Sequence, residues 1–197
     1  MIVEAEIKNT VAKWKKQTLK LKDKHLWRAR PGNRILVLDR GAVRFDIPGD
    51  WVLKMDAESV KVLDREPPDD DCRIEVSYNR LPDGDFATFP VADALRNTFA
   101  DDPRKLSGEA AMIPVNRHDL RAAWMERDFI DPIEDRPAHT RALLAIGGGI
   151  WCLVTMDFWA DDAARVRPVW DEVVRSLRLG LRIDDPTTGA ASVPHLN

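Results

Sequence analysis

The stretch RALLAIGGGIWCLVTMDFW, Arg141–Trp159, decides the fold. Two apolar runs, 141–146 and 150–159, flank Gly147-Gly148-Gly149, and glycine turns a chain through positive φ without steric cost. Side chains in the second run alternate between two faces, and both faces are apolar near the turn. A strand buried on both faces belongs in the middle of a sheet that helices cover on each side. The stretch therefore predicts a central antiparallel hairpin.

Alternating apolar residues predict further strands on either side of this hairpin. Residues 35–38 and 42–47 flank Asp39-Arg40-Gly41 and indicate a second hairpin. The period of two returns at 59–63 and 72–78. We also expect a strand at 120–129, although Ala122-Ala123-Trp124-Met125 would tolerate a helix.

Helical spacing of apolar residues marks three other segments. Residues 90–100 form one, and Pro168 opens a second that follows a short turn at 163–167. The third is the lysine-rich N-terminus, although residues 17–22 alternate like a strand. The apolar positions behind that N-terminal helix prediction are Ile7, Val11, Trp14, Thr18 and Leu21.

Together these patterns predict an α+β fold, a mainly antiparallel β-sheet sandwiched between helices. Three units follow along the chain: a basic, helical extension at 1–30, a single α/β sandwich domain at 31–182 and a flexible tail at 183–197. Pro31-Gly32 separates the first unit from the second.

Composition narrows the class of protein. Of 197 residues, 44% are hydrophobic and 32% charged, which is enough apolar material for a core. The net charge of −3 argues against a nucleic-acid binder. Without a signal-peptide pattern or an apolar run long enough to span a membrane, we expect a cytoplasmic protein with no transmembrane segment. Cys72 and Cys152 lie in apolar runs and are expected to be buried, reduced thiols.

The order of these features resembles the PsbP-like and Mog-like superfamily, which includes the DcrB-like proteins. The resemblance covers roughly residues 35–180. It rests on Phe45-Asp46-Ile47-Pro48-Gly49-Asp50-Trp51, on the hairpin strands Arg141-Ala142 and Ile150–Val154, and on the segment from Pro168-Val169-Trp170 to Ser176–Leu179. It implies an antiparallel sheet between helices and no shared catalytic residues. Some bacterial DcrB-like members act as chaperones for secretion effectors, so it also implies a binding or accessory role.

The search for chemistry finds no nucleophile elbow, phosphate loop or metalloprotease helix. The glycine turn leads into a strand, so no helix N-terminus follows it to hold phosphate. The sequence thus predicts no catalytic residue, no cofactor and no metal site. The four histidines are scattered, and the acidic residues do not match a calcium loop and favour a solvated loop. These residues are His25, His118, His139 and His195, and Asp69, Asp70, Asp71, Asp83 and Asp85.

Three functional hypotheses remain. The first is a non-enzymatic binding or accessory protein, a chaperone or adaptor for another protein such as a bacterial secretion effector. The alternative is an enzyme or small anionic-ligand binder that uses segment 79–118. The third is attachment of the lysine-rich arm to an acidic partner or a membrane surface. The oligomeric state stays open. The alternative rests on Arg96, Arg104, Arg117 and Arg121.

Overall fold

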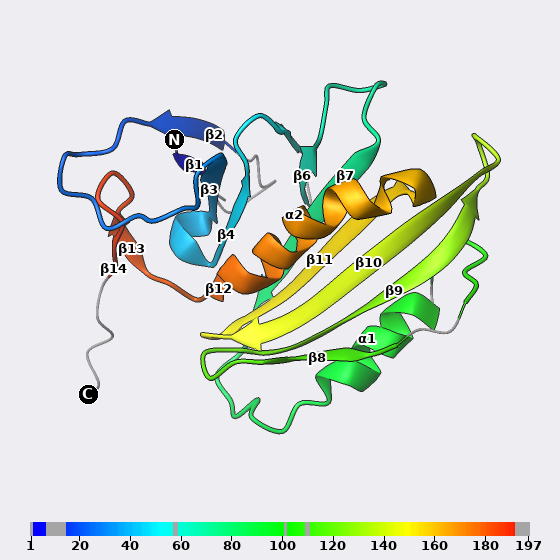
Figure 1. The fold of residues 1–197 in the computed structure, drawn as a ribbon. Helices are drawn as coiled ribbons and strands as arrows, with labels where there is room; N and C mark the ends of the chain where they lie inside the picture. Colours follow the sequence, from blue (N-terminus) through cyan, green and yellow to red (C-terminus); the bar gives the residue numbers. More distant parts are fainter. Residues whose placement is uncertain (1, 7–14, 57–58, 101, 109–110, 192–197) are drawn as a thin grey trace.

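A large antiparallel sheet forms the centre of the protein (Figure 1). The structure is a computed structural model that describes residues 2–6, 15–56, 59–100, 102–108 and 111–191. The sheet has seven strands in the order β5-β6-β7-β11-β10-β9-β8. They are β5 (Val52–Met55), β6 (Val60–Leu63), β7 (Cys72–Arg80), β8 (Ile113–Asn116), β9 (Arg121–Asp131), β10 (Arg136–Gly147) and β11 (Ile150–Trp159).

A second sheet of five strands lies beside it, in the order β12-β4-β3-β1-β2. In this sheet β1 runs parallel to β3, and the other neighbours are antiparallel. A short two-stranded sheet, β13-β14, stands apart. The strands of both are β1 (Ile2–Glu6), β2 (Lys15–Leu19), β3 (Asn33–Leu38), β4 (Val43–Pro48), β12 (Arg178–Leu179), β13 (Ile183–Asp185) and β14 (Ala190–Ala191).

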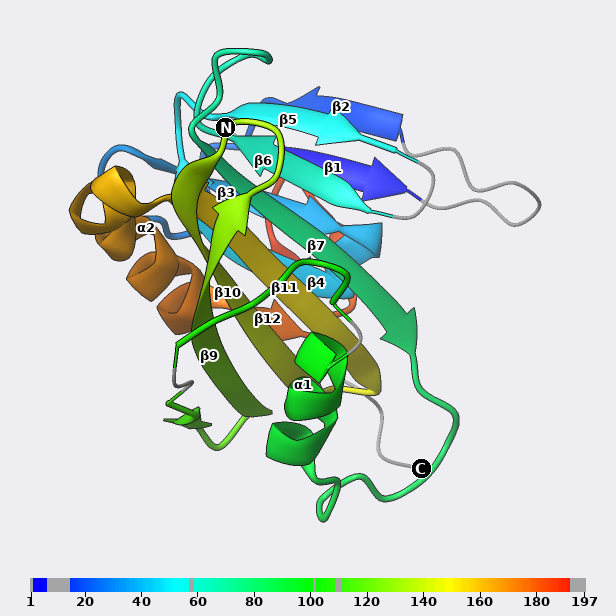
Figure 2. The ribbon, with the colours of Figure 1, turned by 90° about the vertical axis from the view of Figure 1, so that its right-hand side faces the viewer.

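The predicted central hairpin is confirmed. Strands β10 and β11 pair from Ala138↔Trp159 to Gly147↔Ile150 and have neighbouring strands on both sides. Helix α1 (Val91–Ala100) packs on one face of the sheet, and helix α2 (Ala163–Ser176) packs on the other (Figures 1 and 2).

Successive side chains of β10 point to opposite faces of the sheet and belong to two separate hydrophobic cores. Leu143 packs with α2 and the second sheet, whereas Leu144 packs with α1. Both side chains are fully buried, and burial of a leucine contributes about 1.5–3 kcal/mol. The α2 core is the larger, because Phe45 of β4 and Trp170 of α2 fill it from outside the central sheet. The alternation along β10 therefore ties the two helices to one hairpin.

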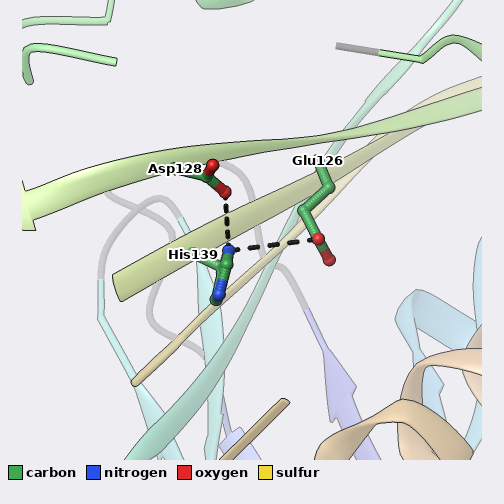
Figure 3. Close-up of side chains that lie close together, drawn as sticks. All are labelled: Glu126, Asp128 and His139. Carbon is green, nitrogen blue, oxygen red and sulfur yellow. Dashed lines mark hydrogen bonds and ion pairs between the residues drawn. The ribbon is translucent and has the colours of Figure 1, made fainter. Parts of the chain in front are cut away.

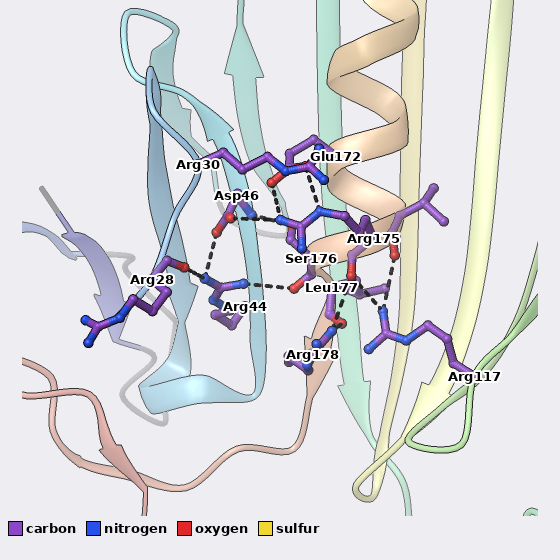
Figure 4. Close-up of polar contacts among 11 residues, drawn as sticks. Arg28, Arg30, Arg44, Asp46, Arg117, Glu172, Arg175, Ser176, Leu177 and Arg178 are labelled. Atoms are coloured by element: carbon purple, nitrogen blue, oxygen red, sulfur yellow. Dashed lines mark hydrogen bonds and ion pairs between the residues drawn. The ribbon is translucent and has the colours of Figure 1, made fainter. Parts of the chain in front are cut away.

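Buried polar groups join α2 to the second sheet (Figure 4). Asp46 on β4 is only 1% exposed and lies 2.7 Å from the Arg44 guanidinium. Its backbone N–H donates to Ser176 Oγ at 2.8 Å. Burial raises the pKa of Asp46 to about 6, against the opposing charge of Arg44. A hydrogen bond from Arg175 lowers the pKa of Glu172, one helical turn before it.

The N-terminus corrects a prediction. Residues 2–6 and 15–19 are strands β1 and β2 of the second sheet, so the predicted helix at 1–30 is wrong for these ranges. Residues 7–14 lie outside the described part. The apolar spacing favoured a helix, but the open edge of β3 offers backbone partners that β1 accepts in parallel register. The strand-like alternation at 17–22 was the better signal.

The C-terminal segment is also more ordered than predicted. Residues 183–191 form β13, a turn and β14, where a flexible tail was expected. Trp27 closes over this turn, with its indole N–H donating to the Pro186 carbonyl at 2.8 Å and its ring against Gly189. Tertiary contact with the loop before β3 thus orders a segment whose local composition predicts none. Residues 192–197 lie outside the described part.

Helix α2 is continuous through Pro168, where two segments were expected. Proline removes one backbone donor and so one hydrogen bond near the start of the helix. The apolar face, with Val166, Trp170 and Val173 buried, evidently outweighs that loss. Within the described residues, no helix combines the length and the apolar character needed to cross a bilayer.

Candidate functional site

The strands of the β9–β10 hairpin continue past the start of α2 to an uncovered turn (Figure 1). We call residues 126–141 the hairpin end. Side chains here keep the alternation of the covered part, so one set faces the α2 side and the other faces the α1 side. Their chemistry, however, changes from apolar to charged.

A cluster of titratable side chains lies on the α2 side (Figure 3). The strand register places Asp128 opposite His139 and Glu126 opposite Arg141. His139 Nδ1 lies 2.7 Å from Asp128 Oδ1 and 4.0 Å from Glu126 Oε1. The imidazole stacks on the Phe158 ring, with centroids 5.3 Å apart. The structure thus brings one imidazole and two carboxylates together.

Arg141 closes the inner side of this cluster. Its Nε donates to Glu126 Oε2 at 2.5 Å, and its guanidinium lies over the rings of Phe158, Trp124 and Trp170 at 4.9–6.0 Å. Arg141 is only 6% exposed. Its Nη1 is buried without a hydrogen-bond acceptor in the described part of the chain. Cation–π contacts therefore offset part of the cost of burying this charge.

On the α1 side the hairpin end borders a cavity of about 210 Å³. Arg104 enters it over the Phe129 ring, 4.5 Å from the centroid, and bonds to Asp102, Asp157 and Thr140. The hydrogen bond from Arg104 lowers the pKa of Asp102. Two carboxylates therefore already neutralise this arginine, so an incoming anion would meet little free positive charge.

The turn and the end of β9 expose large apolar side chains. Ile130 is 56% exposed and Ile133 88% exposed. Asp131 Oδ1 accepts hydrogen bonds from the N–H groups of Ile133 and Glu134, each at 2.9 Å. This Asx-type turn holds the backbone, so Ile133 is presented on an ordered loop.

The four arginines behind the anionic-ligand alternative do not converge. Arg96 pairs with Asp93 on α1, and Arg104 lies in the cavity at the hairpin end. Arg117 and Arg121 line a different cavity, of about 440 Å³, beside the glycine turn. Arg117 there binds Asp119 and the carbonyls of Val174 and Arg175, whereas Arg121 is exposed. The anionic-ligand alternative therefore stays a prediction, with Arg96 and Arg121 both exposed but at different places in the fold.

The histidines and acidic residues are likewise distributed over the molecule. His118 lies at the glycine turn and His139 at the hairpin end, the opposite end of β9 and β10. His25 lies in the loop before β3, and His195 is outside the described part. Asp69, Asp70 and Asp71 precede β7, whereas Asp83 and Asp85 follow it, so β7 separates the two acidic groups.

Cys72 and Cys152 are free and buried, as predicted. Burial raises the pKa of both thiols, so neither is poised as a thiolate.

Sequence reasoning missed the Glu126–Asp128–His139 cluster because it considered residues by spacing along the chain. A signal did exist. Glu126 and Asp128 are two apart on one strand, and a hairpin turn at 132–135 places His139 directly opposite Asp128. Assigning the register of β9 and β10 would have found the cluster.

Comparison with solved structures finds similarity at the level of the fold. A Bacteroides thetaiotaomicron protein matches with a TM-score of 0.52 and 14% identity, over 75% of this chain and 48% of that one. The Ran-binding protein Mog1p of Saccharomyces cerevisiae matches at 0.49 and 12%, over 75% and 95%. PsbP (CyanoP) of Synechocystis matches at 0.48 and 13%, over 78% and 98%.

Sequence comparison gives a closer relationship. The protein alr1449 of Nostoc sp. strain PCC 7120 is 45% identical over 188 residues, which is 95% of this chain and 98% of that protein. The Alr1449 family model matches residues 34–183, a range that includes both sheets' central strands, both helices and the hairpin end. The chain therefore belongs to the Alr1449 family.

Proposed function

We propose that this protein is a non-enzymatic binding protein, a chaperone or adaptor that engages another protein through the hairpin end. The exposed Ile133 side chain carries the proposal. The Ile133 side chain is 88% exposed on a turn that Asp131 orders, so most of its apolar surface contacts water. A partner protein that covers this surface removes it from water, which favours binding.

Preorganisation supports the same role. Because the turn is already hydrogen-bonded, little conformational entropy is lost when a partner covers it. The turn carries the exposed acids Glu134 and Asp135 and follows the half-buried Asp131, so the partner surface should combine an apolar pocket with basic residues at its rim.

Site-specific photo-crosslinking in the host tests the proposal. A photoreactive residue at position 133 should yield one dominant crosslinked protein. The same residue at Leu26, another exposed apolar position (67%), which lies in the loop between β2 and β3, should not. Equal crosslinking patterns at both positions, or none at position 133, would argue against a binding role for the hairpin end.

A second candidate is binding of a small anion in the cavity beside the glycine turn, which is supported by the exposed Arg121 at its edge. A phosphate titration followed by NMR should then shift the amides of 147–149, and Arg121→Ala should abolish the shifts. Unchanged spectra up to millimolar phosphate would remove this candidate.

A further inference from the structure

Three possible metal-ligand atoms meet on the α2 side of the hairpin end. One ligand atom from each of Glu126, Asp128 and His139 lies within 4.8 Å of the other two. Ligand atoms about 2.0–2.2 Å from one ion lie roughly 3.0–3.5 Å from each other. The separations from Nδ1, 2.7 Å to Asp128 and 4.0 Å to Glu126, bracket that range. Side-chain movements that shorten the Nδ1–Oε1 separation by about 0.5–1 Å would therefore bring His139 and Glu126 to one ion.

We propose that Glu126, Asp128 and His139 bind one divalent first-row transition-metal ion, Zn²⁺ or Mn²⁺. The donor set carries the choice of metal. An imidazole nitrogen favours a transition metal over Ca²⁺ or Mg²⁺, and two carboxylates suit Zn²⁺ and Mn²⁺. Thiolate-bound metals do not fit, since both cysteines are buried elsewhere in the core.

The ligands are held in place before any ion arrives. Phe158 stacks on the imidazole of His139 and limits its rotation. Arg141 Nε occupies Glu126 Oε2, which leaves Oε1 for the ion. All three ligands stand on two paired strands, and rigid elements position a site better than loops do. Their side chains are 22%, 35% and 55% exposed for His139, Glu126 and Asp128, so an ion can enter from solvent.

Arg141 provides an independent observation that points to a ligand. Its Nη1 is buried beside the cluster and has no acceptor in the described part of the chain, although buried donors are normally paired. Glu126, Asp128 and Arg141 sum to one negative charge, and a divalent ion makes the site positive. A water or small anion in an open coordination position would give this N–H an oxygen acceptor. This proposal is independent of partner binding at Ile133.

Metal titration of tag-free protein tests the site. Isothermal titration with Zn²⁺, and electron paramagnetic resonance with Mn²⁺, should show one ion per chain. Asp128→Asn, Glu126→Gln and His139→Gln should each weaken binding at least about tenfold. On Zn²⁺ addition, the ¹⁵N signal of the His139 Nδ1 should shift, which a structural ion pair with Asp128 would not produce.

His118→Gln and Asp70→Asn are the matched controls, because each removes the same type of ligand outside the cluster. His118 lies beside the glycine turn, and Asp70 lies in the loop before β7. Thermal unfolding of every variant checks that the fold is intact. Zn²⁺ and Mn²⁺ affinities weaker than millimolar, or affinities that fall equally in the controls, would overturn the proposal. A changed partner crosslink at position 133 would not bear on it.

Discussion

The two halves of β10 differ in how far the helices cover their side chains, although they belong to one strand with one side-chain alternation. In the half next to the glycine turn, Leu143 and Leu144 face opposite helices and are both fully buried. In the half next to the 132–135 turn, His139 and Arg141 occupy the same face as Leu143, where His139 stacks on Phe158 and Arg141 is buried against Trp170 at the margin of the core. The strand pairing continues unchanged through both halves.

This difference shows that the pairing of the strands and the burial of their side chains have separate causes. The β9–β10 ladder needs only the main chain, so it extends as far as the strands do. Most buried apolar side chains of these strands lie where the helices cover the sheet, although Phe129 and Ala138 at the hairpin end are buried as well. The partly exposed side chains of Glu126, Asp128 and His139 therefore mark where ligands or partners have access to the sheet.

The largest expected effect is a difference in the free energy of unfolding between a variant in the covered half and a variant at the hairpin end. Leu143→Ala in the covered half should cost about 2–5 kcal/mol, because it leaves a cavity between β10 and α2. Ile133→Ala at the hairpin end should change stability by less than about 0.5 kcal/mol. Urea unfolding of both variants measures the contrast, and similar costs would show that the hairpin end is part of the cooperative core.

The comparison of covered and uncovered regions extends to charged side chains, with one buried carboxylate and one exposed carboxylate. Asp46 is buried under α2, and its pKa is raised to about 6 from an ordinary value of about 3.9. The folded state then binds this proton more tightly than the unfolded state does, so the contribution to stability falls as pH rises from about 4 to 6. Across that window the wild type should lose up to about 3 kcal/mol relative to Asp46→Asn.

Asp128→Asn is the control for this pH effect. Asp128 is 55% exposed, and its replacement should change stability by less than about 1 kcal/mol. Unfolding free energies at several pH values between 4 and 7 give both results. An Asp46→Asn variant whose pH profile runs parallel to that of the wild type would contradict the buried-charge account.

At the covered end of the hairpin, two neighbouring glycines of the turn can be compared with each other. Gly148 has φ +54°, and an added Cβ would lie 2.7 Å from backbone atoms of Leu179 and Gly180. Gly149 has φ +73° but nothing within 4 Å. Gly148→Ala should therefore cost about 2–3 kcal/mol, and Gly149→Ala about 1 kcal/mol. Thermal unfolding measures the two costs, and equal values would show that the close approach of β12 is not tight.

The sequence predicted those elements whose signal is local. The period of two at 141–146 and 150–159, and the helical spacing at 90–100, report directly on which faces are buried. The N-terminal strands and the β13–β14 turn were mispredicted because long-range partners form them. The β3 edge holds β1, and Trp27 holds the C-terminal turn.

The candidate site depended on register as well as period. Glu126, Asp128 and His139 are unremarkable along the chain, and only the pairing of β9 with β10 brings them together. The arginines of segment 79–118 show the converse. They are close in sequence, but intervening strands and local carboxylates keep Arg96, Arg104 and Arg117 apart.

Affinity for the protein crosslinked at position 133 tests the central claim most directly. The account predicts that Ile130→Ser with Ile133→Ser weakens this affinity at least about tenfold, since each buried isoleucine contributes about 1.5–3 kcal/mol. Leu26→Ser should leave it unchanged. Wild-type affinity in the double variant, with both proteins folded, would contradict the assignment of the hairpin end as the binding surface.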